Sequence, residues 1–197
     1  MKKKQSIIQS IPYKGKAENY DNAGKQPVNW MSKAAQINRA ARIIFKIVEK
    51  DFNKLSRQSR LDNDKSVEIE PTYPFLMDVF IFLAALAIEN LLKGILMISK
   101  PGLISGGKLT GNLITSHKLS DLSIGSEIEF TEEENELLHA GTEAIESWGR
   151  YPIPKNVRKL KSSRTIKLVI GEIYNKLYDK LVYELKERDD SKRHGAL

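Results

Sequence analysis

The chain has 197 residues, a formal net charge of +7 and 41% hydrophobic residues, enough apolar material for one domain with a buried core. It has no cysteine, which excludes disulfides, thiolate catalysis and cysteine-based metal sites. Its first residues lack the apolar block of a secretory signal, so we expect a cytoplasmic protein. The positive charge favours polyanions such as RNA, or serves solubility alone.

The sequence divides into one predicted domain and two charged ends. Lysine is frequent in residues 1–26, which we interpret as a basic extension, and residues 188–197 form a predicted charged tail. Residues 27–187 carry the patterning of a single helical domain. Its first helix is expected over residues 27–55, because apolar residues recur there at spacings of three and four and Pro27 suits a helix start.

The second helix is expected over residues 74–99 and is apolar almost all round. A membrane span needs about 20 predominantly apolar residues, whereas the longest uncharged run here, residues 79–88, is much shorter. We therefore expect the central helix of a soluble protein, with no membrane partner. Lys100-Pro101-Gly102 ends it.

A long connection over residues 101–130 follows, with room for a short helix near residues 117–122. The stretch from Gly102 to Lys108 contains the glycines and lysine of a P-loop. However, Leu109 stands where a Ser or Thr must reach magnesium, and a helix precedes the glycines where a P-loop needs a strand. We therefore expect a flexible loop here rather than a phosphate site.

The third helix is expected over residues 131–148. Thr131 and Glu134 have the spacing of a capping box, which explains the acidic residues around them as helix-start chemistry. The fourth helix is expected over residues 164–187, with one apolar stripe. The predicted fold is an all-α antiparallel bundle of four long helices, with the long connection between the second and third.

The third helix ends in Trp148-Gly149-Arg150-Tyr151-Pro152-Ile153-Pro154, where glycine and two prolines prevent continuation. Arg150 is thereby displayed at a stiff corner, and a cationic segment suited to phosphate follows it. Its basic residues are Lys155, Arg158, Lys159, Lys161 and Arg164. The alternative for Arg150 is an ion pair with Glu89 that locks the helix end onto the central helix.

Other polar residues stand out less. Glu89 and Lys93 lie four apart on the second helix and can pair, and the simplest interpretation is a surface stripe. His117, His139 and His194 lie far apart and lack metal-ligand spacing, so we expect no metal and no cofactor.

Taken together, three segments resemble the HEPN family of small helical bundles. They are Ala87-Ile88-Glu89-Asn90-Leu91-Leu92-Lys93, Ser116-His117-Lys118-Leu119-Ser120-Asp121-Leu122 and Trp148-Gly149-Arg150-Tyr151-Pro152. Many HEPN proteins are metal-independent ribonucleases that act as dimers in toxin–antitoxin or phage-defence systems. The resemblance implies RNA as partner, a homodimer, an antitoxin-like protein partner, and functional roles for Glu89, Lys93, His117 and Arg150, with Tyr151 and the basic segment in binding.

The chain departs from the family signature, in which a histidine follows the arginine after four to six residues. Cleavage by the ribose 2′-hydroxyl needs a group that takes its proton and a cation that stabilises the phosphate. Arg150 can supply the cation, and His117 can supply the base only if the fold, or a dimer partner, brings it beside Arg150. The chain is then either a ribonuclease with a different base or a degenerate RNA-binding derivative that has lost cleavage. Two further alternatives remain open: a non-catalytic interaction module, and a nucleotide-binding bundle with a pocket lined by Glu89, Lys93 and Arg150.

Overall fold

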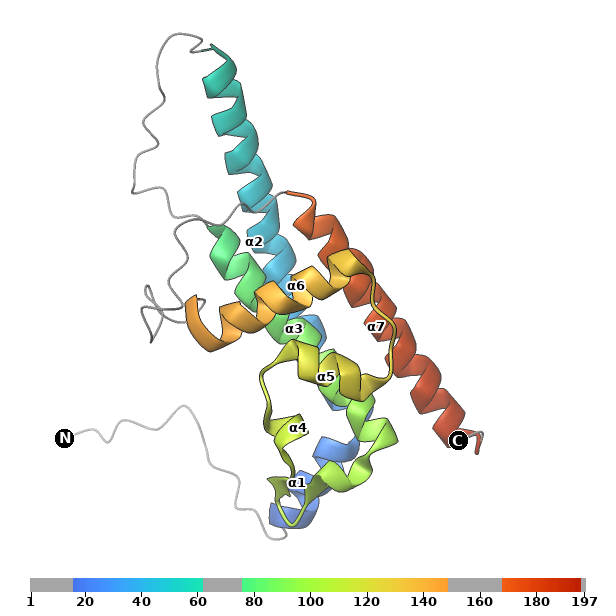
Figure 1. Ribbon diagram of the computed structural model, residues 1–197. Helices are drawn as coiled ribbons and strands as arrows, with labels where there is room; N and C mark the ends of the chain where they lie inside the picture. The colour runs from blue at the N-terminus through green and yellow to red at the C-terminus, as the bar shows by residue number, and fades with distance from the viewer. Residues whose placement is uncertain (1–15, 62–75, 149–167, 196–197) are drawn as a thin grey trace, which may run out of the picture.

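The computed structural model describes residues 16–61, 76–148 and 168–195, and it confirms an all-α fold (Figure 1). In chain order the elements are α1 (Lys16–Lys25), α2 (Pro27–Leu61), α3 (Leu76–Ser99), a 3₁₀ turn (Pro101–Leu103), β1 (Ile104–Ser105), β2 (Lys108–Leu109), α4 (Asn112–Thr115), α5 (Leu119–Ser126), α6 (Glu132–Glu143), a π-helical turn (Ala144–Trp148) and α7 (Ile170–Arg193). The helices α2, α3, α6 and α7 correspond to the four that the sequence predicts.

The central helix is α3, as the sequence predicts. It contacts α2, α5, α6 and α7, and side chains all around it are buried, including Phe80, Ile88, Leu91 and Leu96. Its length and composition would also suit a membrane span, but 72% of its most apolar 18-residue window is buried inside the protein. Its apolar character is therefore explained by the core of this fold.

The four long helices do not form a regular antiparallel bundle. In Figure 1, α2 runs opposite to α3 and α7, and α6 lies across α3. Two contacts show that α3 and α7 run in the same direction: Phe80 packs edge-on against Tyr174 near their starts, and Lys192 donates to the Ile98 carbonyl near their ends. The second and fourth helices of an antiparallel four-helix bundle also run in the same direction, so this pair agrees with the predicted arrangement. The departure from it is α6, which crosses α3.

The charged ends contain more regular structure than we expected. Helix α1 lies within the predicted N-terminal extension, and α7 continues to Arg193 through most of the predicted tail. Basic side chains of α7 explain why this helix continues into the predicted tail. Arg188 donates to the Ser126 carbonyl at the end of α5, at 2.8 Å, and Lys192 reaches the end of α3. Cations at helix C-termini satisfy carbonyls that lack a partner within their own helix, so this part of α7 is packed.

The glycine-rich stretch is a tight hairpin, not a flexible loop. Strands β1 and β2 pair antiparallel through a two-residue turn whose residues, Gly106 and Gly107, have φ of 62° and 76°. Both values require the left-handed region that glycine adopts without strain, as a type I′ turn demands. The two backbone N–H groups donate to the Asp21 carboxylate on α1, each at 2.9 Å. An internal carboxylate therefore occupies the position where a P-loop would hold phosphate.

The start of α6 confirms the predicted capping box. Thr131 Oγ1 accepts from the Glu134 N–H at 3.2 Å, and the Glu134 carboxylate accepts from the Thr131 N–H at 2.9 Å. Glu134 is buried and also accepts from Lys180 Nζ of α7 at 2.8 Å. The capping box therefore stabilises the start of α6, and Glu134 also fixes this start to α7.

Tyr174 and Tyr178 of α7 pack where α7 meets α2 and α3. The Tyr174 hydroxyl donates to Asn38 Oδ1 of α2 at 2.7 Å, and both groups are buried. Burial, followed by the effect of the neighbouring Tyr178 phenol, raises the pKa of Tyr174 well above its usual value of about 10. The fold therefore holds this phenol in its neutral form.

Folding stability should fall as pH rises above about 10, because the Tyr174 phenol then ionises in the unfolded chain but not in the folded one. One such group contributes a slope of up to about 1.4 kcal/mol per pH unit. Tyr174→Phe should cost about 1 kcal/mol at pH 8 through the lost hydrogen bond, and less at pH 11. Urea unfolding at the two pH values measures this. Tyr183→Phe, which changes an exposed side chain of the same helix, is the control. If Tyr174→Phe lowered the free energy of unfolding equally at both pH values, the prediction would be contradicted.

Candidate functional site

The surface-stripe interpretation of Glu89 and Lys93 is wrong, because both residues are buried. Each is only 6% exposed, on the face of α3 that turns toward the core. Lys93 Nζ donates to Glu89 Oε1 at 2.7 Å. Desolvating two charges is costly unless their remaining hydrogen-bonding capacity is also used, so a pair buried in the central helix needs further partners.

His117 supplies one of these partners from the connection between α4 and α5. Its Nδ1 lies 3.1 Å from Glu89 Oε1 and 3.2 Å from Oε2. While the carboxylate is almost fully buried, the imidazole side chain is 49% exposed. The Glu89 carboxylate therefore joins a buried ammonium group to a histidine at the surface.

The segment that carries His117 is held from both sides. Leu119, the first residue of α5, is fully buried, and its N–H donates to Thr142 Oγ1 of α6 at 2.9 Å. Gly141 makes close packing possible here: a Cβ atom at this position would lie 2.8 Å from Leu119 Cδ1 and 3.0 Å from the Cβ of Ala85 on α3. Helices α3, α5 and α6 thus meet next to His117 and fix its backbone.

The contact with Glu89 determines which ring nitrogen of a neutral His117 carries the proton. An ionised carboxylate only accepts hydrogen bonds, so the facing Nδ1 must be the donor. The neutral ring then has an unprotonated Nε2, which can take a proton from a reactant. A carboxylate that holds a histidine in this tautomer is the arrangement used to orient general bases in enzymes. The cluster of Glu89, Lys93 and His117 is therefore able to act in acid–base chemistry.

The other predicted site residues lie outside the described residues. These are Arg150, Tyr151, Lys155, Arg158, Lys159, Lys161 and Arg164. The described chain stops two residues before Arg150, in the π-helical turn Ala144–Trp148, which contacts α3. Turns of this type within helices frequently occur at functional sites. The proposed Arg150–Glu89 ion pair stays a prediction, and in the described structure Glu89 is bonded to Lys93 and His117.

The remaining histidines do not join the cluster. His139 is exposed and lies 3.7 Å from Glu143 on its own helix, and His194 caps the end of α7 by contacting the Asp190 carbonyl. Within residues 16–61, 76–148 and 168–195, no group of three metal-ligating side chains could hold a metal ion. Comparison with known proteins adds no assignment: no protein-family model, curated protein or solved structure matches the chain.

The α6 residues that hold the segment next to His117 were not predicted from the sequence. Thr142 and Gly141 are ordinary residues of a helical pattern, and neither belongs to a motif. The only available signal was the presence of small residues at Ala85 and Gly141, which permits close helix packing but does not name a partner.

Lys93→Met should destabilise the fold by about 3 kcal/mol, because it leaves the buried Glu89 carboxylate without its ammonium partner. The double variant Glu89→Gln/Lys93→Met should lose less than the sum of the two single variants. Urea unfolding of all four proteins gives the coupling. Arg193→Met is the control, because it breaks a pair at the same spacing whose arginine side chain is 65% exposed, and it should cost less than about 1 kcal/mol. Equal costs for Lys93→Met and Arg193→Met would contradict the prediction.

Proposed function

We propose that the chain is a HEPN-like, cytoplasmic RNA-binding protein that cleaves RNA without a metal ion, as a homodimer in a toxin–antitoxin or phage-defence setting. The observation that carries the proposal is the contact of Glu89 with both Lys93 and His117. The sequence resemblance selected these three residues, and two of them lie 28 positions apart in the chain. Their contact supports a common role.

In this proposal His117 is the general base. Its Nε2 takes the proton of a ribose 2′-hydroxyl, and the 2′-oxygen forms a bond to phosphorus while the bond from phosphorus to the 5′-oxygen breaks. The 5′-oxygen takes a proton from water, leaving a 2′,3′-cyclic phosphate and a 5′-hydroxyl. General-base catalysis of this kind contributes roughly 10²- to 10⁴-fold to a rate. Glu89 acts as a positioning residue, and Lys93 compensates its charge.

Arg150 supplies the second requirement, a cation for the phosphate on which charge develops. A guanidinium stays charged at neutral pH and can meet two phosphate oxygens through parallel hydrogen bonds. The basic residues between Lys155 and Arg164 would extend the contact along the RNA backbone. Their contribution should depend strongly on salt, because binding to phosphates releases counterions.

The test is incubation of pure protein with total RNA in EDTA. Wild-type protein should give 2′,3′-cyclic phosphate ends, and His117→Ala and Arg150→Ala should each reduce the rate by at least about 100-fold. His139→Ala is the matched control, because His139 is exposed and lies outside the cluster. Circular dichroism checks that the variants fold.

RNA binding is measured in parallel by fluorescence anisotropy at several salt concentrations. Arg150→Ala should weaken binding, while His117→Ala should affect cleavage more than binding. Unchanged binding and cleavage in both variants would overturn the proposal. A stable complex with a protein partner and no affinity for RNA would instead support the interaction module.

A further inference from the structure

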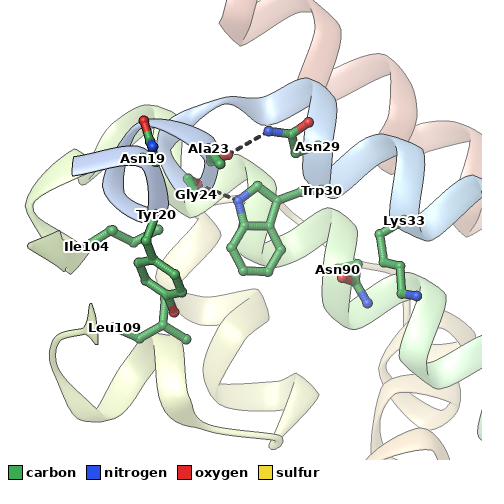
Figure 2. A pocket seen from close by; sticks show the side chains of 10 residues that line it. All are labelled: Asn19, Tyr20, Ala23, Gly24, Asn29, Trp30, Lys33, Asn90, Ile104 and Leu109. Atoms are coloured by element: carbon green, nitrogen blue, oxygen red, sulfur yellow. Dashed lines mark hydrogen bonds between the residues drawn. The ribbon is translucent and has the colours of Figure 1, made fainter. Parts of the chain in front are cut away.

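A separate pocket of about 910 Å³ lies between α1, the start of α2, α3 and the β1–β2 hairpin (Figure 2). Its volume falls in the range of small-molecule sites. The residues that matter for its chemistry are Tyr20, Trp30, Lys33, Asn90, Ile104 and Leu109. None of them belongs to the Glu89 cluster.

The walls of this pocket are fixed by hydrogen bonds. Trp30 Nε1 donates to the Gly24 carbonyl at 2.6 Å, and Asn29 Nδ2 donates to the Ala23 carbonyl at 2.7 Å, so the start of α2 is tied to the end of α1. Asp21 fixes α1 to the hairpin through Gly106 and Gly107. The pocket is therefore formed before a ligand binds, which lowers the entropic cost of binding.

The lining separates apolar from polar groups. Figure 2 shows Trp30 in the middle, with Tyr20, Ile104 and Leu109 to one side and Lys33 and Asn90 to the other. Aromatic and aliphatic side chains suit a flat ring, and the Lys33 ammonium suits an anion. The Asn90 amide nitrogen is committed to the Leu86 carbonyl at 2.7 Å, so its Oδ1 is left to accept from a ligand N–H.

From this arrangement we propose that the pocket binds a nucleotide. The base lies against Trp30 and Tyr20, and the phosphate lies toward Lys33. The ligand can be a free nucleotide or one unstacked nucleotide of an RNA chain, since both present a flat base and a phosphate. This inference stands on the pocket alone and does not need His117 or Arg150 to act in cleavage.

Isothermal titration of the full chain with AMP, GMP, CMP and UMP, and with an adenosine octaribonucleotide, tests the inference. Tyr20→Ala and Lys33→Gln should each weaken binding by about tenfold, the size expected from losing one base-stacking contact or one phosphate contact. The controls are Tyr183→Ala and Lys46→Gln, because both side chains are exposed and neither lines the pocket. The affinity for adenosine, which lacks the phosphate, should not change in Lys33→Gln.

If AMP binds and the octamer does not, the pocket is assigned to a free nucleotide. Binding of the octamer that depends on Tyr20 assigns it to a nucleotide of RNA. If neither the monophosphates nor the octamer bind in a way that depends on Tyr20 and Lys33, the inference is overturned. This failure is distinct from failure of the proposed ribonuclease, which is measured with His117→Ala and Arg150→Ala.

Discussion

The buried carboxylate of Glu89 is the constraint on which the site depends. A charge in the middle of the central helix is tolerated only with partners, and Glu89 has two: Lys93 one turn along α3 and His117 from the segment before α5. An apolar residue at position 89 would remove the reason for both contacts. Because replacing buried ion pairs with apolar residues often leaves stability unchanged, the pair is better explained by positioning His117 than by stabilising the fold.

The surrounding fold serves this geometry. The part of α3 around Glu89 is buried, with Ala87, Ile88, Leu91 and Leu92 all at most 1% exposed, so packing fixes the direction of the Glu89 side chain. Helix α6 crosses α3, and its Gly141 and Thr142 hold Leu119 in place, two residues from His117. Basic residues of α7 donate to carbonyls at the ends of α3 and α5 and so attach α7 to both helices. The result is a rigid interior beside a half-exposed imidazole.

Much of the fold was predictable because its signals are local. The all-round apolar pattern of α3 and the capping box at Thr131 each depend on neighbouring residues, and both are confirmed. The crossing of α6 over α3 and the burial of Glu89 depend on contacts between distant segments, which periodicity cannot specify. The contact of His117 with Glu89 also joins two distant segments, so periodicity could not predict it. The HEPN resemblance selected both residues as functional, without indicating that they touch, and their role stays a prediction.

Glu89 should hold His117 in the tautomer with an unprotonated Nε2, because its carboxylate accepts from the facing Nδ1. Nitrogen-15 NMR of the histidine rings, recorded above the pH at which His117 is protonated, measures this directly. We expect the Nδ1–H tautomer for His117 in the wild-type protein, and its loss in Glu89→Met/Lys93→Met, which removes the acceptor and leaves no buried charge, with His139 unchanged as internal control. A His117 ring that carries its proton on Nε2, or a tautomer unaffected by Glu89→Met/Lys93→Met, would show that Glu89 does not set the tautomer.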